Sequence, residues 1–521
     1  MTLTKSTILA GAASLVLATA PAADAQKSAD TLRLAINDMF PSSDPYHFPL
    51  DENAEFYRTV YQPLVIFDEH QQKFVPILAK SYQRIDDTTF EFTLRDGVRF
   101  HNGDTFTADD AKATIDYVKD PKVNIRFKSR YDWVKSVEKL GPDKIRIVTK
   151  QPYALALSNL AYSISMLDAK ALNGLDNKED YGRLSPIGTG PYKISYVDRN
   201  KGILVERDED YFGKSGADGG YYRAPVARVH GLPIPDRETQ KAELMTGQVD
   251  LLRNITADDA RSLAKVPNVE VTNTPSGMLL YVTLDAAGRS ANKAMTDERV
   301  RKAFIMAIDR KALVHNFVPG GDTAELPKSI CFSWTTACAP TTEPYAYDPE
   351  QAKRLLAEAG YPNGFDLILH SHQPVAYIAE AIAGELRKVG IRATVEPLPL
   401  AAYVKQRGDG DFTAFTGFYP TTALPDVENI LDFFFGGNRD YWNDKAIHRA
   451  ETAGDTEFDL AKRTKIYTPA LDRVNQHAYI LPISELPIAW AHSKDVALLP
   501  NPMSKGETRL GDFAWADAPA H

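Results

Sequence analysis

Short strand patterns alternate with helix patterns along the chain, and this alternation limits the possible folds more than any other feature. Residues 31–36 and 90–94 follow strand patterns, the second with apolar residues at every other position. Apolar residues at helical spacing mark segments 300–308 and 378–389. Because strands and helices are mixed throughout, the sequence predicts the α/β class.

Local signals predict where several elements begin or turn. Thr107 and Asp348 each precede a helical pattern and are typical N-cap residues. Asp96 and Gly97 form a turn signal after the strand pattern, so we expect residues 98–100 to return as the partner strand of a hairpin.

The chain is longer than one hydrophobic core can organise. Its 521 residues exceed the roughly 250–300 at which single cores stop growing, so we expect more than one domain. Hydrophobic residues make up 44% and charged residues 25%, which is typical of a water-soluble globular protein. The Gly- and Pro-rich segment 186–192 is a candidate crossing between domains.

The net charge of −9 argues against two classes of partner. Nucleic-acid binding needs a basic face that neutralises phosphates, so we expect no nucleic-acid partner. An acidic chain is also poorly suited to an anionic membrane surface.

The first 25 residues follow the pattern of a secretory signal peptide. Lys5 supplies the positive start, residues 8–20 the apolar stretch, and Ala-Asp-Ala at 23–25 the cleavage site. No cysteine follows that site, which excludes a lipid anchor there. We therefore predict export to the periplasm; the alternative is an N-terminal membrane anchor, for which the apolar stretch is short.

Cys331 and Cys338 are the two cysteines of the chain. In an oxidising compartment such a pair is read as one disulfide, which would close a small loop around Trp334. Two free thiols are the alternative; a zinc pair is disfavoured because the CxxC spacing is absent.

Common catalytic signatures are absent from the sequence. It contains no G-x-S-x-G elbow, no H-E-x-x-H helix and no P-loop motif. We therefore predict a binding protein without a cofactor rather than an enzyme. A secreted hydrolase, or a periplasmic chaperone or receptor on the same fold, remains the alternative.

Six runs, in this order, resemble one known family. They are FEFTLRDGVRF (90–100), HNGDTFTADD (101–110), IGTGPYKI (187–194), ELMTGQVDLL (243–252), DERVRKAFIMAIDRKALV (297–314) and YDPEQAKRLLAEAGYPNGFDL (347–367). Together they resemble the extracytoplasmic solute-binding proteins of peptide/nickel ABC importers, over about residues 31–487.

The resemblance implies a periplasmic-binding-protein-like fold with two lobes, a hinge and three domains. Domain I would comprise residues 26–65, 187–275 and 485–521, domain II residues 66–186, and domain III residues 276–484. The ligand, a small molecule or peptide, would lie between domains I and III. The protein, which we expect to be a monomer, would deliver it to ABC permease subunits in the inner membrane.

The resemblance leaves the ligand open. Peptide-binding relatives hold the ligand's amine with an Asp in a segment like 416–431, where this chain has Leu424 instead. Asp426 or Glu428 could substitute in part. Dipeptide-type relatives place an Arg where this chain has residues 371–377, which contain none. A peptide, a modified peptide, an opine, a sugar conjugate or a metal chelate therefore stays possible.

Seven residues are candidate ligand contacts, and each has a structural alternative. They are Asp426, Tyr419, Phe418, Trp442, Trp334, Arg439 and Arg407. The aromatic rings could stack on the ligand or belong to the core. The carboxylate could pair with an amine or cap the helix that follows it. The two arginines could meet an anion or lie on the solvated surface.

His370 and His372 are two positions apart on a strand pattern, so both face one side. Such a pair can bind a metal. Since no carboxylate or cysteine nearby in the sequence completes a site, we predict no metal centre.

Overall fold

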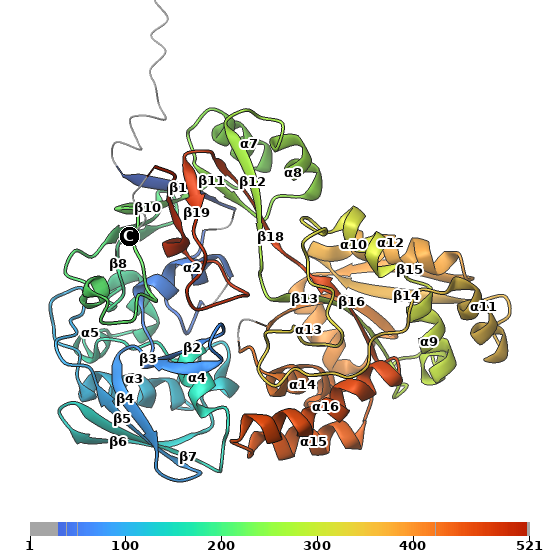
Figure 1. Cartoon of the computed structure of the whole chain (residues 1–521), viewed down its shortest axis with the longest axis horizontal. Coiled ribbons are helices and arrows are strands. Elements are labelled where there is room, and N and C mark those ends of the chain that lie inside the picture. The colour runs from blue at the N-terminus through green and yellow to red at the C-terminus, as the bar shows by residue number, and fades with distance from the viewer. Residues whose placement is uncertain (1–29, 38, 49–50, 422–423, 518–521) are drawn as a thin grey trace, which may run out of the picture.

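Mixed α/β architecture is confirmed by the structure, a computed structural model that describes residues 30–37, 39–48, 51–421 and 424–517 (Figure 1). The predicted signal peptide lies outside the described residues. Three larger sheets and two short ribbons carry the strands. The described part of the chain contains no helix that is long and apolar enough to cross a membrane.

A seven-stranded sheet organises the first body, at the left and top of Figure 1. Its order is β12 (Val269–Thr274), β18 (Ile488–Ser493), β11 (Leu251–Arg253), β1 (Thr31–Ile36), β10 (Arg228–Pro233), β9 (Gly202–Arg207) and β8 (Tyr192–Asp198). The central strand β1 pairs in parallel with both β10 and β11. The predicted strand at residues 31–36 is confirmed.

A four-stranded antiparallel sheet lies below it, at the lower left of Figure 1. Its order is β4 (Ala79–Arg84), β5 (Thr89–Leu94), β7 (Lys144–Thr149) and β6 (Val134–Gly141). The predicted hairpin at residues 98–100 is wrong. Gly97 does make the turn, with φ +76°, but β5 pairs with β4 and β7. The residues after the turn form only an isolated bridge, between Arg99 and Thr105.

A five-stranded sheet organises the second body, at the right of Figure 1. Its order is β15 (Ile391–Leu398), β14 (Phe365–His372), β16 (Ala414–Pro420), β13 (Met278–Leu284) and β17 (Ile480–Glu485). Strand β14 runs parallel to β15 and β16, whereas β13 is antiparallel to β16 and β17. Two ribbons complete the strands: β2 (Val65–Asp68) with β3 (Lys73–Pro76), and β19 (Val496–Leu498) with β20 (Phe513–Trp515).

Helices surround these sheets. In the first body and the four-stranded sheet they are α2 (Asp51–Val60), α3 (Ala108–Lys119), α4 (Ala156–Tyr162), α5 (Ala169–Asn173), α6 (Tyr181–Leu184), α7 (Arg237–Met245) and α8 (Ala257–Leu263). In the second body they are α9 (Glu298–Met306), α10 (Arg310–Phe317), α11 (Pro349–Glu358), α12 (Ala376–Arg387), α13 (Leu400–Asp409), α14 (Val427–Phe435), α15 (Lys445–Asp455) and α16 (Leu460–Gln476). The predicted caps are confirmed: Thr107 closes a capping box with Asp110, and Asp348 accepts from the Gln351 amide.

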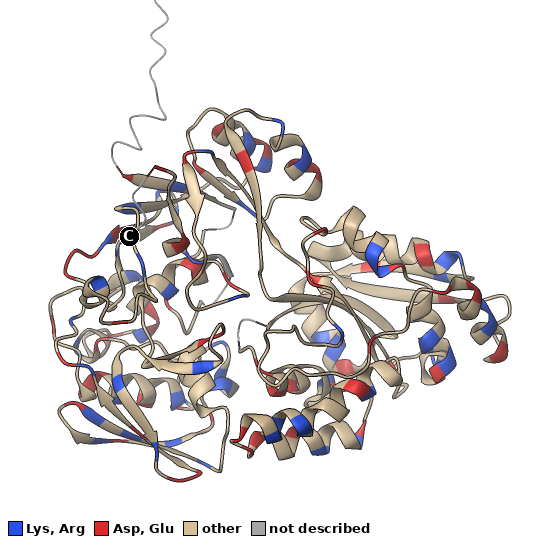
Figure 2. Ribbon diagram, in the orientation of Figure 1, with Lys and Arg blue, Asp and Glu red and all other residues tan. Residues whose placement is uncertain are grey.

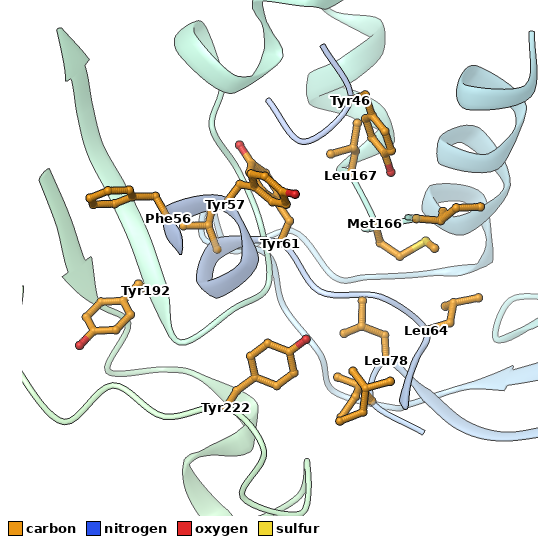
Figure 3. Packing of buried hydrophobic residues seen from close by; sticks show 14 of the residues in the cluster. Tyr46, Phe56, Tyr57, Tyr61, Leu64, Leu78, Met166, Leu167, Tyr192 and Tyr222 are labelled. Atoms are coloured by element: carbon orange, nitrogen blue, oxygen red, sulfur yellow. The ribbon is translucent and has the colours of Figure 1, made fainter. Parts of the chain in front are cut away.

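Separate hydrophobic cores fill the two bodies. In the first, one cluster joins the seven-stranded sheet, α2 and the four-stranded sheet. Figure 3 shows Phe56 and Tyr57 of α2, Tyr61 directly after this helix, and Tyr222 within the cluster. In the second body, α9, α10 and α12 cover one face of the five-stranded sheet, while α13, α14 and α16 cover the other.

Two short crossovers connect the bodies, and one carboxylate ties them together. Three residues separate β12 from β13, and two separate β17 from β18. The Glu485 carboxylate, only 5% exposed, accepts hydrogen bonds from the Ser276 and Gly277 amides at 3.0 and 3.2 Å. Gly277 adopts a φ of +61°, which a residue with a Cβ rarely adopts. The Ser276 hydroxyl donates to the Leu486 carbonyl at 2.5 Å.

Replacing Glu485 by Ala should therefore destabilise the protein. The change leaves two amides of the crossover without their acceptor, which costs about 1–3 kcal/mol for each buried group that stays unpaired. Urea denaturation would measure the loss, with exposed Glu270 of the adjacent β12, changed to Ala, as the control. Equal free energies of unfolding for the two variants would contradict this role.

The predicted disulfide is confirmed between Cys331 and Cys338, with the two Cα atoms 6.0 Å apart. Cys331 is 2% exposed and belongs to the second body's core together with Trp334. The bridge therefore closes a loop against packed side chains.

Replacing both cysteines by Ala should lower the free energy of unfolding by about 2–4 kcal/mol, because the unfolded chain loses a constraint. Chemical denaturation would measure this. Unfolded but unreduced wild-type protein should bind no maleimide, and reduced protein should bind it at both positions; labelling before reduction would argue against the bridge.

Candidate ligand-binding site

Both large sheets direct the carboxyl ends of their parallel strands toward the crossovers. Strand β12 runs in the same direction as β1. Both β12 and β11 are antiparallel to β18, which lies between them, and β11 is parallel to β1. Its last residue, Thr274, precedes the first crossover. In the second sheet, β13 begins where β14, β15 and β16 end, since it is antiparallel to β16. Ligands of open α/β sheets bind outside such carboxyl ends, so this edge is the candidate site.

A second contact joins the two bodies away from the crossovers. The Ala154 amide, near the four-stranded sheet, donates to the Asp455 carbonyl at the end of α15, at 2.7 Å. Phe458 packs near the Phe90 ring at 6.5 Å and under the Arg84 guanidinium at 4.1 Å. The bodies thus touch on both sides of the region between the sheet edges.

Trp334 lies where the disulfide loop approaches the other body. Its ring stacks on Phe332, with centroids 5.4 Å apart, and is 7% exposed. Its carbonyl accepts from the Gln72 side chain of the β2–β3 turn at 3.5 Å. The same loop bridges to the residues before α14: the Thr336 amide donates to Pro425 and the Val427 amide donates to Thr336. The structure therefore brings Trp334 and the start of α14 together.

Asp426 caps α14 and is only 1% exposed. Its Oδ1 accepts from the Glu428 amide at 3.0 Å and pairs with Arg463 of α16. Its Oδ2 is buried without a hydrogen-bond partner. The cap that the sequence offered as the alternative role is thus present, while pairing with a ligand amine stays a prediction.

The neighbouring aromatic residues differ in exposure. Tyr419 is 5% exposed, and its ring lies 4.2 Å from that of Phe433. Phe418 is half-buried and contacts the His372 ring at 5.0 Å. Trp442 is 6% exposed, and its indole N–H donates to the Leu284 carbonyl at 2.8 Å. Trp442 therefore serves the core, and Phe418 is the most accessible ring of the three.

The two candidate arginines have different surroundings. Arg407 is 8% exposed, so the solvated-surface alternative is wrong for this residue. It donates to the Tyr403 hydroxyl at 2.8 Å and to the Phe433 carbonyl at 2.5 Å. Arg439 is partly exposed and pairs with Asp432 at 3.0 Å. Together with Trp442 and other aromatic residues, both arginines line a cavity of about 10 Å³, which is far too small for a peptide.

His370 and His372 both point into the second body. The described residues contain no group of three His, Cys, Asp or Glu side chains that could hold a metal. Glu396 approaches His370 to 3.7 Å, a neighbour that the sequence spacing did not predict. Burial lowers the pKa of both imidazoles, that of His372 to about 4.

A cavity in the first body was not predicted from the sequence. It holds about 30 Å³ beside α2 and the C-terminal segment. The Glu507 carboxylate pairs there with both Arg58 and Arg509, and Glu69 accepts from the Ser504 hydroxyl at 2.9 Å. Arg58 and Glu507 are 449 residues apart in sequence, and Glu69 and Ser504 are 435 apart, so no local pattern marks these two pairs.

An acidic cluster beside the second contact was also not predicted. It comprises Asp426, Glu428, Asp432, Glu451 and Asp455, with Arg463 and Arg439 as cations and Tyr153 and Tyr467 as phenols. Figure 2 shows acidic residues at the ends of α15 and α16 that face the four-stranded sheet. Burial, and then neighbouring carboxylates, raise the pKa of Glu451 to about 7; burial and nearby carboxylates, offset in part by Arg463, raise that of Asp455 to about 6.

These raised pKa values predict how stability depends on pH. The folded protein holds protons on Glu451 and Asp455 that the unfolded chain releases near pH 4. The contribution of these two carboxyl groups to the free energy of unfolding is therefore fully present below that pH. It is lost as the pH rises from about 4 to about 7. Asp455→Asn should flatten this fall in the free energy of unfolding, measured by urea denaturation across that range. Exposed Asp258→Asn is the control; an unchanged slope in Asp455→Asn would refute the assignment.

Comparison with known proteins identifies the family. The central region of family 5 of the bacterial extracellular solute-binding proteins matches residues 73–442. The chain belongs to this family. The family prediction from the sequence is thereby confirmed, and this solute-binding protein is a component of ABC importers of the peptide and nickel type.

Relatives and solved structures agree with that assignment. The glutathione-binding protein GsiB of Escherichia coli (strain K12) is 28% identical over 514 residues, covering 93% of this chain and 95% of GsiB. NikA from Brucella suis in complex with Fe(III)-EDTA has a TM-score of 0.80 at 21% identity, covering 93% and 99% of the two chains. DppA from Helicobacter pylori in complex with the peptide STSA has a TM-score of 0.75 at 22% identity, covering 94% and 99%. The predicted periplasmic-binding-protein-like fold is confirmed.

Proposed function

We propose that this solute-binding protein works in the periplasm, where it captures a peptide or peptide-like ligand between domains I and III and delivers it to the permease. The observation that carries the proposal is the meeting of the carboxyl edges of the two sheets at the crossovers. Ligand contacts made only when the bodies close would stabilise the closed state.

The arrangement of the sheets supports the proposed domain limits. Every strand of the seven-stranded sheet falls in segments 26–65, 187–275 or 485–521 of domain I. The four-stranded sheet lies within domain II, residues 66–186. The five-stranded sheet lies within domain III, residues 276–484, except for the last residue of β17.

Relatives suggest which ligands to test. Their names mention glutathione for GsiB, the peptide STSA, the dipeptide Met-Leu, agropinic acid and Fe(III)-EDTA. In this chain Leu424 is 4% exposed at the position of the amine-binding Asp. Without that Asp and the expected Arg, a zwitterionic dipeptide loses two charged clamps. We therefore place glutathione, which the similarity to GsiB suggests, ahead of free dipeptides.

Thermal denaturation with this panel tests the proposal. A ligand at 100 times its Kd should stabilise the folded protein by about 2.7 kcal/mol through mass action, so its Tm should rise. Mass spectrometry of solutes released by denaturation from freshly purified protein complements the panel. If no panel member raises the Tm and no solute co-purifies, the peptide-like ligand class is rejected. Turnover of a bound peptide would instead support the hydrolase alternative.

A further inference from the structure

His372 ends β14 at the carboxyl edge of the five-stranded sheet. Three rings surround it: Tyr403 at 4.2 Å, and Phe415 and Phe418 at 5.0 Å each. Its side chain is buried, with a residue exposure of 8%. We refer to His372 and these three rings as the imidazole box.

Neither ring nitrogen of His372 has a hydrogen-bond partner within the described part of the chain. A neutral imidazole carries one N–H donor and one acceptor, and leaving both unpaired in a buried place is unfavourable. It is the one described histidine whose two ring nitrogens are both buried and unpaired. His101, by contrast, uses its two nitrogens at the Gly190 carbonyl and the Gly188 amide.

The Arg407 guanidinium places a positive charge beside the imidazole box, and no carboxylate among the described residues pairs with it. Arg407 donates to the Tyr403 hydroxyl and forms no ion pair among the described residues, although it is 8% exposed. Its charge is one of the two causes that keep His372 neutral. An N–H donor beside a buried guanidinium suits an oxygen acceptor, either a carboxylate or a carbonyl.

Access to the box lies on the side of the ligand site. Phe418, one wall of the box, is half-buried and follows Gly417 near the end of β16. A Cβ on Gly417 would lie 3.2 Å from the Nδ1 atom of His372, so the glycine leaves this nitrogen uncovered. Phe418 is the least buried of the three rings, so movement of its side chain is the route by which a solute could reach this nitrogen.

We propose that His372 is a ligand-binding residue whose imidazole N–H donates to a carboxylate or carbonyl oxygen of the solute once Phe418 has moved aside. This inference rests on the proposed function. It assigns the solute an oxygen acceptor that enters the second body next to an apolar, aromatic surface.

Substitution of His372 by Leu separates a binding role from a structural one. Removing two unpaired polar atoms should leave the Tm of the ligand-free protein unchanged or raise it. Affinity for glutathione, the carboxylate-bearing probe measured by calorimetry, should fall at least tenfold. His372→Asn, which keeps a donor and an acceptor, should retain part of the affinity. His370→Asn, two positions earlier on the same face, is the matched control and should stay within twofold of wild type.

Two results would overturn the proposal. One is an affinity of His372→Leu within twofold of wild type. The other is a lower Tm for ligand-free His372→Leu, which would show that the imidazole serves the fold. If wild-type protein does not bind glutathione, the probe becomes the solute that co-purifies with it or the panel member that raises its Tm. If none exists, the proposed ligand class fails on its own, and the Tm comparison still decides whether His372 is structural.

Discussion

The Glu485 carboxylate and the two crossovers that it joins control how the two bodies can move. Each crossover is only two or three residues long, so the bodies cannot separate, and the carboxyl edges of both sheets stay next to one another. Glu485 belongs to β17 but bonds to the amides before β13, which makes the two connections one unit. A motion of one body against the other must therefore be absorbed by a few backbone torsions, which is the usual behaviour of a hinge.

A second contact joins the two bodies on the side away from the crossovers. Ala154 meets Asp455 there, beside a cluster of carboxylates that burial and mutual repulsion keep partly protonated. The five carboxylates all belong to α14, its N-cap or α15, so they repel one another within the second body whether or not the bodies close. A solute that adds contacts across the gap would favour the closed arrangement of the bodies. The crossovers thus limit how one body can move against the other, and the ligand would set the population of the closed state.

The sequence predicted correctly those features that depend on residues close together along the chain. The cap at Thr107, the strand at residues 31–36 and the Cys331–Cys338 bridge are all confirmed. The prediction of a hairpin at residues 98–100 is wrong because β5 pairs on its two edges with β4 and β7, which leaves no edge for residues 98–100. The Arg463 partner of Asp426 and the burial of Arg407 arise from packing between distant segments, which no local pattern encodes.

The surroundings of Asp426 and Leu424 explain why the sequence pattern of segment 416–431 could indicate a binding site but not the ligand that it binds. Asp426 is the carboxylate that the pattern offers, yet Arg463 already neutralises it inside the body. Leu424 is apolar and buried at the position where the resemblance to peptide-binding proteins implies an acid. Because Arg463 already pairs with Asp426, we expect a ligand amine to gain little from this carboxylate, and the proposed His372 donor and the aromatic surfaces would contribute to selection instead. A site that desolvates such groups rejects solutes lacking the matching acceptor more strongly than solutes of the wrong size. We therefore expect the chain to keep the family's fold while it binds its solute through contacts other than the Asp and Arg that the resemblance implies for dipeptide binders.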